Sequence, residues 1–381
     1  MKSQTVVVLG GGIGGVVTAN RLRKKLDSGH RVVLVNREPD FSFAASYLWV
    51  MNGSRRPDQV VRPLKKLERH GIEVIIGNVD AIDPAARCVI VDGQILQADH
   101  LVVSLGAEWD AERVPGMSKY GYTFSTLTGA RELGAKLEYI ETGRIVLVTA
   151  APLYKCPAAP YEAALLIEAG LRKRGVRDKV SVAMRSAEAA PMPVAGKEVS
   201  KAVMDLMASR GIDYQAGQQI SGLEPGRVHF TESSEATDLL VYMPTIKPPL
   251  AIANSPLAFS DGWIHSDRST MATEFENVFA IGDNAHIPLA IGKPLPRAGV
   301  FAHGQAEVVA DSISARINGK SATRRFEGEG GCFIEIGGGV AAYGSGNFYA
   351  EPAPQIKLRL PARRWHWGKS ALELQVMRRW L

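Results

Sequence analysis

The chain has 381 residues, of which 46% are hydrophobic and 22% are charged, and this composition excludes a disordered or collagen-like protein. At roughly 150 residues per domain, the length predicts two or three domains. The formal net charge of +6 resides in residues 355–381, so the remainder of the chain is neutral. Because a neutral body does not follow a phosphate backbone, we expect no nucleic-acid partner.

The three cysteines, Cys88, Cys156 and Cys332, are too few and too scattered for a disulfide framework. No CxxC motif is present, so neither a zinc ribbon nor the attachment of a c-type haem is predicted. The apolar run over residues 5–9 leads directly into glycines, which predicts no cleavable signal peptide. No apolar stretch reaches about 18 residues, the length that a membrane-spanning helix needs.

Residues 5–36 predict one βαβ unit, with a strand over 5–9, a helix over 16–26 and a strand over 31–36. A GxGxxG motif stands between the first strand and the helix, where glycines allow backbone to approach a pyrophosphate at the helix N-terminus. We predict a dinucleotide site here, against the alternative of a purely structural turn, with these residues: Gly10, Gly12, Ile13, Gly14 and Gly15. Where an acid usually holds the ribose, at the end of the second strand, the candidates are Asn36, Arg37 and Glu38.

Short strands with a hairpin turn at Asp92-Gly93 are predicted within residues 72–104. A second βαβ-like region begins at Arg144 and continues through a helix over 161–174. Its first turn reads TAAPLYKCPAAPYE, with three prolines and no glycine. This turn lacks the phosphate-binding pattern, so the dinucleotide is expected at the first unit.

FAD rather than NAD is indicated by the segment NVFAIGD at 277–283, in which Gly282 and Asp283 end a predicted buried strand. The segment resembles the second FAD fingerprint of flavoproteins with two dinucleotide-binding domains, where the Asp binds the ribityl chain. The alternative is an ordinary strand that ends in a Gly-Asp turn. The SLGAE turn at 104–108 adds Gly106 to the predicted FAD site.

Two of the cysteines stand in Gly- or Pro-rich segments, Cys156 in YKCPAAPYE and Cys332 in GGCFIEIGGG. We expect both in turns rather than within strands or helices, a setting that suits an accessible thiol. Cys88 begins an alternating strand and is interpreted as structural, because free cysteine often packs as a small hydrophobe.

Several stretches occur in a fixed order: FxFxxSxxWV (41–50), CPAAPYE, LPRAGVFAHGQAEVVA (295–310), GCFIEIGGG and WHWGK. Together they resemble sulfide:quinone oxidoreductases and the related flavoprotein subunit of flavocytochrome c sulfide dehydrogenase, over essentially the whole chain. The resemblance implies a redox-active pair, Cys156 and Cys332, on one face of the flavin. Glu162 follows Cys156 at the start of a helix, either as a local base or as a favourable partner of the helix dipole.

This chain departs from that family at several points. A third cysteine is absent from 124–130, a histidine is absent from RSAEAAPMP, and the usual Pro-Lys reads Pro296-Arg297. Flavocytochrome relatives attach FAD through a cysteine near FSFAAS, and residues 1–87 contain no cysteine. The absence of that cysteine, together with the missing haem motif, favours a quinone over a cytochrome as the electron acceptor.

The tail over 362–381 places Trp365, Leu372, Val376 and Trp380 at helical spacing among basic residues. Such a helix suits a membrane interface, and the alternative is a helix docked on the body or on a partner subunit. The flavin face toward this tail is expected to hold the quinone, with Phe301, Phe333 and Pro249 as pocket walls.

The predicted fold is α/β, with two Rossmann-like dinucleotide-binding domains of the glutathione-reductase type and a C-terminal membrane-binding segment. Residues 1–110 and 243–323 form the FAD-binding domain, 111–242 the second Rossmann-like domain with Cys156, and 324–381 the C-terminal region with Cys332. We expect a peripheral cell-membrane enzyme that oxidises sulfide to sulfane sulfur or polysulfide and reduces a quinone. Alternatives are a type II NADH:quinone oxidoreductase, a flavoprotein subunit that serves a cytochrome, and a non-catalytic flavoprotein. The oligomeric state stays open, with a homo-oligomer among the options.

Overall fold

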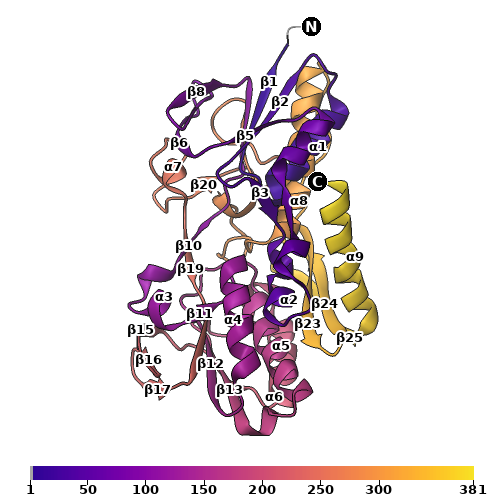
Figure 1. Cartoon of the computed structure of the whole chain (residues 1–381). Coiled ribbons are helices and arrows are strands. Elements are labelled where there is room, and N and C mark those ends of the chain that lie inside the picture. The colour runs from indigo at the N-terminus through magenta and orange to yellow at the C-terminus, as the bar shows by residue number, and fades with distance from the viewer. Residues whose placement is uncertain (1–2) are drawn as a thin grey trace.

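Two parallel sheets organise the chain, one in each half of the molecule (Figure 1). The computed structural model describes residues 3–381. The first sheet has five strands in the order β21-β9-β1-β2-β5, and all its neighbours run parallel. Its strands are β1 (Thr5–Leu9), β2 (Arg31–Asn36), β5 (Glu73–Ile76), β9 (His100–Val103) and β21 (Val278–Ala280).

The first sheet is apolar on both faces, as a parallel sheet with covered faces requires. In β1 the residues from Val6 to Leu9 are 0% exposed. Helix α1 (Ile13–Lys25) packs beside α8 (Gly299–Ile317) on one face, so segments that are nearly 300 residues apart share one core. The chain therefore returns to this half after it has built the other.

The second sheet also has five parallel strands, in the order β11-β18-β12-β13-β14. Its strands are β11 (Tyr122–Thr123), β12 (Gly143–Thr149), β13 (Val180–Arg185), β14 (Asp213–Gln215) and β18 (Leu239–Met243). The accompanying helices are α4 (Leu127–Tyr139), α5 (Ala159–Lys173) and α6 (Lys197–Ser209). The domain boundaries drawn from the sequence stay a prediction.

Short antiparallel elements decorate both halves. Two three-stranded sheets comprise β6 (Val79–Asp83), β7 (Cys88–Val91) and β8 (Gln94–Gln97), and β15 (Ile220–Glu224), β16 (Arg227–Phe230) and β17 (Ser234–Ala236). The remaining strand pairs are β3 (Asp40–Ser42) with β4 (Val61–Pro63), β10 (Glu108–Asp110) with β19 (Thr245–Lys247), and β20 (Ile264–His265) with β22 (Ala285–His286). Three short helices complete these parts: α2 (Tyr47–Met51), α3 (Met117–Tyr120) and α7 (Leu250–Ala253).

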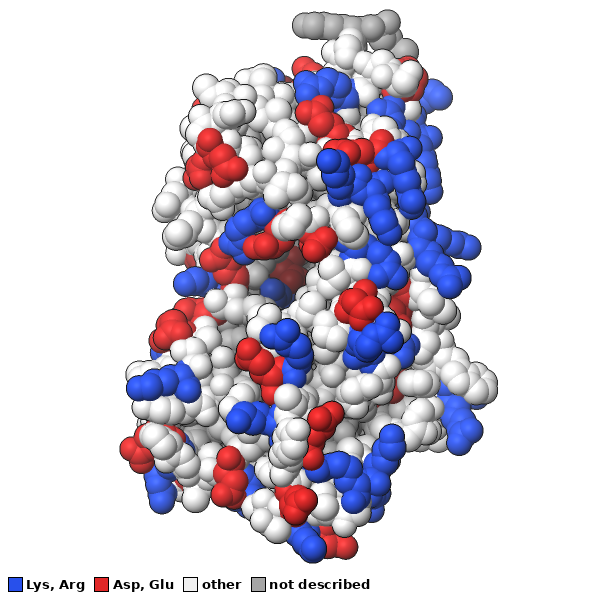
Figure 2. Space-filling view, in the orientation of Figure 1, with Lys and Arg blue, Asp and Glu red and all other residues white. Residues whose placement is uncertain are grey.

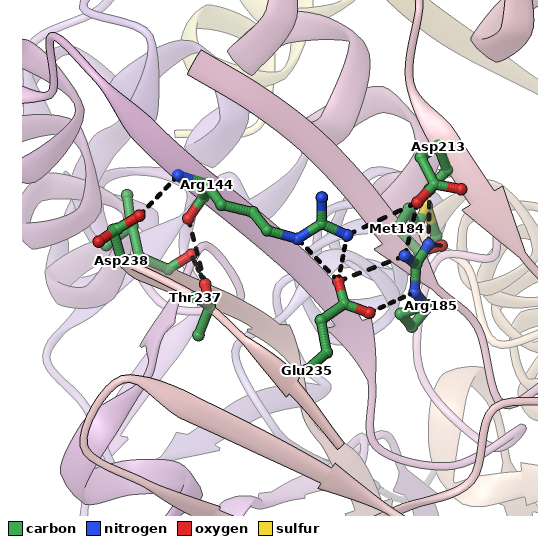
Figure 3. Close-up of polar contacts among 8 residues, drawn as sticks. Arg144, Met184, Arg185, Asp213, Glu235, Thr237 and Asp238 are labelled. Atoms are coloured by element: carbon green, nitrogen blue, oxygen red, sulfur yellow. Dashed lines mark hydrogen bonds and ion pairs between the residues drawn. The ribbon is translucent and has the colours of Figure 1, made fainter. Parts of the chain in front are cut away.

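An ionic network ties the second sheet to β17 (Figure 3). Arg185 on β13 is 3% exposed, and its Nε lies 2.8 Å from Glu235 Oε2. Its Nη2 lies 2.6 Å from Asp213 Oδ2, and Arg144 also reaches Glu235, at 2.6 Å. Because a buried guanidinium is costly without such partners, we interpret this network as structural.

The C-terminal region forms a three-stranded sheet and a final helix. Its elements are β23 (Glu329–Gly337), β24 (Val340–Asn347), β25 (Gln355–Ala362) and α9 (Arg363–Arg379). Figure 1 shows α9 along one side of the molecule, with its last residues beside α1 and α8. The prediction that Cys332 lies in a turn is wrong, because it lies within β23, where it pairs with Gly344.

The apolar face predicted for the tail is wrong in part. Val376 is 1% exposed and belongs to the first core, while Trp380 stacks on His303 with ring centroids 5.1 Å apart. The large apolar side chains that α9 leaves exposed are Trp367 at 64%, Leu374 at 52% and Leu372 at 40%. Helix α9 has apolar residues on two faces, and only one of these faces packs against the body of the protein. The sequence spacing of the apolar residues does not show which face that is. Among residues 3–381, no helix has the length and apolar character needed to cross a membrane.

Candidate active site

The glycine turn between β1 and α1 is shaped for close backbone contact. Gly10 has a φ of +103°, and a Cβ on Gly15 would lie 1.8 Å from the Gly10 carbonyl oxygen. A Cβ on Gly12 would meet nothing within 4 Å, so this glycine borders open space at the N-terminus of α1. The turn is therefore a cradle whose backbone amides and helix dipole suit a phosphate.

The other residues predicted for this end of the site differ in how they are placed. Gly14 packs against Ser104, and Ile13 lies against Gly299 at the start of α8. Asn36 at the end of β2 accepts the Gly11 N–H through Oδ1 at 2.7 Å, so it shapes the glycine turn. The two residues after it have exposed side chains, Arg37 at 64% and Glu38 at 68%, in a mutual ion pair. Their role toward a ribose stays a prediction.

The side-chain amides of two buried residues, Asn284 and Gln305, hold the other predicted FAD-binding segments, the SLGAE turn and the Gly282-Asp283 turn. Asn284 accepts the Gly106 N–H at 3.0 Å and donates to Val103 O, which joins the SLGAE turn to the end of β21. Gln305 on α8 accepts the Gly282 N–H at 2.8 Å. The structure thus places Gly106 and Gly282, which are 176 residues apart, on one edge of the first sheet.

Asp283 lies beside two cations, and burial raises the pKa of its carboxyl while Lys155 and Arg297 oppose that shift. Arg297 Nε donates to the Asp283 carbonyl at 2.8 Å, and its buried Nη2 has no hydrogen-bond partner among residues 3–381. Figure 2 shows the molecule hollowed between its two halves, with acidic and basic atoms on the floor of the hollow. The free donor and the Gly12 cradle fit a dinucleotide with a polar chain such as FAD.

Cys156 and Cys332 meet although 176 residues separate them, and both thiols are free. Cys156 precedes α5 and has a φ of 56°, and its N–H donates to Arg297 O at 2.7 Å. A non-glycine residue with a positive φ is held there by its surroundings and is frequent at functional sites. Cys332 reaches it from β23, which packs against α5.

The two thiols differ in acidity. A hydrogen bond from Cys332 lowers the pKa of the Cys156 thiol, helped by Lys369 and by the Ala159 N–H, against the effects of burial and of Glu162. That same hydrogen bond, together with burial, raises the pKa of Cys332 well above its ordinary value. Cys156 is therefore the sulfur that ionises first, at a helix N-terminus where a thiolate is favoured.

Glu162 lies in the first turn of α5, is 3% exposed and forms an ion pair with Lys369 of α9. Burial raises the pKa of Glu162, while Lys369 opposes that rise. Lys369 is itself 5% exposed, and its pKa is raised because the carboxylates of Glu162 and Glu335 outweigh its burial. A fixed cation and anion thus stand next to the thiol pair, each stabilised by the other.

Lys369 belongs to a set of three polar anchors that fasten α9 over the cysteines. Its neighbours on the same helix are His366, whose Nδ1 lies 2.9 Å from Glu335 of β23, and Glu373. Glu373 accepts from Ser46 Oγ at 2.6 Å and from Arg55 Nε at 2.8 Å. In the sequence Lys369 is one of the basic residues of the tail, within WHWGK, and no local pattern indicates that it is buried against Glu162.

The three residues predicted to line a quinone pocket do not converge. Phe301 is 4% exposed and packs edge-on against Phe348, with ring centroids 4.9 Å apart. Phe333 lies on β23 against Tyr343, on the side that α9 covers. Pro249 begins α7, which packs against β6 on the opposite side of the molecule from α9 (Figure 1). The quinone assignment stays a prediction.

A buried carboxyl beside the cysteine turn was also missed. Glu188, just beyond β13, accepts hydrogen bonds from Tyr154 and, at 3.1 Å, from Tyr161. Burial raises the pKa of Glu188. The three side chains form a buried polar cluster between β13 and the segment that leads into α5.

Comparison with known proteins supports the assignments drawn from the sequence. The profile of the pyridine nucleotide-disulphide oxidoreductase family matches residues 4–306. Proteins of this family are FAD-binding oxidoreductases, which confirms FAD as the cofactor and an oxidoreductase as the class of enzyme.

The relatives also confirm the resemblance to sulfide:quinone oxidoreductases. The chain is 27% identical to the sulfide-quinone reductase of Aquifex aeolicus, over 97% of this chain and 89% of that protein. It is 28% identical to the mitochondrial sulfide:quinone oxidoreductase of Dictyostelium discoideum, over 74% of this chain and 66% of that protein. The solved Aquifex aeolicus structure superimposes with a TM-score of 0.89 at 24% identity and covers 98% of this chain and 91% of that one, so the overall fold is shared.

Proposed function

This chain belongs to the pyridine nucleotide-disulphide oxidoreductase family, and within it we propose a membrane-peripheral sulfide:quinone oxidoreductase that works through Cys156 and Cys332. The observation that carries the proposal is the contact between these two thiols at the start of α5. The names of the relatives from Aquifex aeolicus and Dictyostelium discoideum support the same substrates.

The difference in acidity between the thiols sets the direction of attack. When the two sulfurs are joined as a disulfide, hydrosulfide attacks the sulfur whose partner leaves more readily as a thiolate. Cys156 lies at the N-terminus of α5, where Lys369 and the Ala159 N–H stabilise its thiolate, so Cys156 is the better leaving group and attack falls on Cys332. The Cys156–Cys332 bond breaks, its electron pair stays on Cys156, and the new sulfur–sulfur bond leaves a persulfide on Cys332.

Glu162 and Lys369 have separate tasks in this scheme. Lys369 supplies a positive charge that favours the Cys156 thiolate. Glu162 is the buried carboxylate placed to accept the proton of the persulfide, and its raised pKa suits a proton acceptor near neutral pH. Sulfane sulfur or a polysulfide is the product when further hydrosulfide takes up the persulfide sulfur.

FAD, when bound, supplies the two-electron acceptor through which a quinone is reduced. The residues proposed to hold it are the Gly10–Gly15 turn, Gly106, the Gly282-Asp283 turn and Arg297, and their geometry supports this. Arg297 also fixes the Cys156 turn through its carbonyl oxygen, so one residue links the proposed cofactor site to the thiol pair.

Anaerobic stopped-flow reduction of the bound flavin tests the proposal. Sulfide is expected to reduce the flavin of the wild-type protein and of the control variant Cys88→Ser, and to fail in Cys156→Ser and Cys332→Ser. Turnover is then expected with a short-chain quinone and not with cytochrome c. Reduction by NADH without response to sulfide would show a type II NADH:quinone oxidoreductase, and reduction by neither donor would favour a non-catalytic flavoprotein.

Membrane attachment through α9 is the second part of the proposal. The exposed side chains of Trp367 and Leu374 lie on a different face of α9 from the three polar anchors. The same helix carries Arg363, Arg364 and Arg378. An apolar face bordered by cations suits an interface with anionic lipid.

Removal of residues 362–381 would not test this attachment, because it also removes Lys369 and core residues. Trp367→Ser combined with Leu374→Ser leaves both in place and is expected to weaken sedimentation with anionic liposomes, while Tyr139→Ser, at an 83% exposed position elsewhere, leaves it unchanged. Equal binding by all three proteins would contradict attachment through α9.

A further inference from the structure

A cluster of three metal-ligating side chains lies apart from the cysteines. Among residues 3–381, Asp261, His265 and His286 place one ligand atom each within 4.8 Å of one another. His265 on β20 and His286 on β22 are direct partners of a parallel strand pair, so both rings leave the same face and stack with centroids 4.5 Å apart. The backbone therefore sets the spacing of the two rings.

Asp261 is aimed at both histidines by the turn before β20. Its Oδ1 accepts the Trp263 N–H at 3.0 Å, which fixes the carboxylate plane. Its Oδ2 lies 3.1 Å from His265 Nε2 and 2.9 Å from His286 Nδ1. Two imidazole nitrogens and one carboxylate oxygen thus converge on a single point from three positions in the chain.

The geometry points to a binding site for a divalent transition-metal ion of the zinc class at Asp261, His265 and His286. Zinc bonds of about 2.0–2.1 Å in a tetrahedron place neighbouring ligand atoms about 3.3 Å apart, close to the 3.1 and 2.9 Å that separate the Asp261 carboxylate from the two histidines. Imidazole and carboxylate ligands suit zinc, and water completes the fourth position because all three side chains are partly exposed, at 25–39%.

The surroundings place one cation near this site and restrict one of its rings. The guanidinium of Arg297 lies 4.0 Å from the centre of the Trp263 ring, and its charge is partly offset by Asp283 and Asp261. The Phe259 ring stacks on His265 at 4.1 Å and limits its rotation. A bound ion would cross-link the Asp261 turn to both strands.

Isothermal titration with Zn²⁺ tests the site on the full chain with its flavin bound. Thiols also bind zinc, so the titration is run in parallel on a chain in which Cys88, Cys156 and Cys332 are Ser. One equivalent is expected to bind with micromolar affinity in both. His265→Asn and His286→Asn are expected to weaken it by more than about tenfold, as loss of a ligand or of its support does.

The matched control is His229→Asn, because His229 also faces a carboxylate, with Nε2 3.1 Å from Glu224, and is 39% exposed. It is expected to bind zinc as the parent does. Zinc binding that disappears with the thiols would overturn the inference. So would equal losses in His229→Asn and His286→Asn, or no change in either cluster variant.

Discussion

Each half of the molecule has a βα turn after the central strand of its parallel sheet, and the two turns differ in length and in residue types. In the first, between β1 and α1, Gly12 borders open space, and Asn36, the last residue of β2, accepts the Gly11 N–H and so holds the turn. In the second, between β12 and α5, Cys156 takes a positive φ. There the carboxyl beyond β13, Glu188, is held by Tyr154 and Tyr161.

The difference shows that the fold positions a turn at the start of a helix in each half, and that the residue types in the turn determine what it can bind. Backbone amides without side chains suit a phosphate, so the glycine turn suits the dinucleotide. The turn of the second unit carries tyrosines and a thiol in place of glycines, and the N-terminus of its helix favours a thiolate. Substitutions can therefore test each turn separately, at a glycine of the first turn and at the charged partners of the second.

The largest effect is expected from Gly12→Val in the first turn. A Cβ at position 12 meets no protein atom within 4 Å, so we expect the fold to be retained while the added side chain fills the cradle. We expect flavin content to fall below about a tenth of wild type, since each ~1.4 kcal/mol of lost contact is tenfold in affinity. The flavin absorbance per protein and the far-ultraviolet circular dichroism measure both effects.

Gly170→Ala on α5 is the matched control, because a Cβ there also meets nothing within 4 Å. It is expected to keep its flavin. Full flavin content in Gly12→Val would mean that the first turn does not contact the dinucleotide, and the contrast between the two turns would fail.

The two turns also differ in how far the sequence predicted them. The glycine turn follows from spacing between a strand and a helix, a local pattern, and the structure contains both elements. The partners of Cys156 are not local. Its contact with Cys332 rested on resemblance to a family, and Lys369, 207 residues beyond Glu162, gave no local signal.

The tail illustrates the same limit. Helical spacing correctly indicated a helix over most of 362–381, but it could not show that Val376 faces the core while Trp367 faces outward. A net charge of +6 likewise did not show that Lys369 is buried in an ion pair. Such facts depend on which distant elements pack together, and composition and periodicity do not specify that.

A smaller but still large effect is expected from Lys369→Met beside the second turn. Loss of the cation leaves Glu162 buried without its partner, which destabilises the protein by roughly 3–5 kcal/mol. It also raises the pKa of Cys156, so alkylation by iodoacetamide at pH 7 becomes slower and its pH profile moves to higher pH.

Lys201→Met is the control for this change, since Lys201 pairs with Asp205 at 2.6 Å with both side chains exposed. Its cost is expected to stay under about 1 kcal/mol, with no change in alkylation. The double variant Lys369→Met/Glu162→Gln is expected to recover both stability and fast alkylation, because the charge of Glu162 raises the pKa of Cys156 at least as much as that of Lys369 lowers it. Unchanged alkylation in Lys369→Met alone would show that Lys369 acts only on folding.

The smallest effect concerns Glu188 and depends on pH. Burial raises the pKa of Glu188 above its ordinary value of 4.5, so its stabilising contribution is fully present below that value and is lost as the pH rises through the folded-state pKa. Glu188→Gln keeps an oxygen that accepts from both tyrosines and does not ionise. Chemical denaturation is therefore expected to show the variant gaining stability relative to wild type from pH 5 to pH 8. Glu132→Gln, on the exposed side of α4, is expected to show no such trend. A parallel response of both variants would mean that the carboxyl ionises freely, and the second turn would then be more open than its tyrosines indicate.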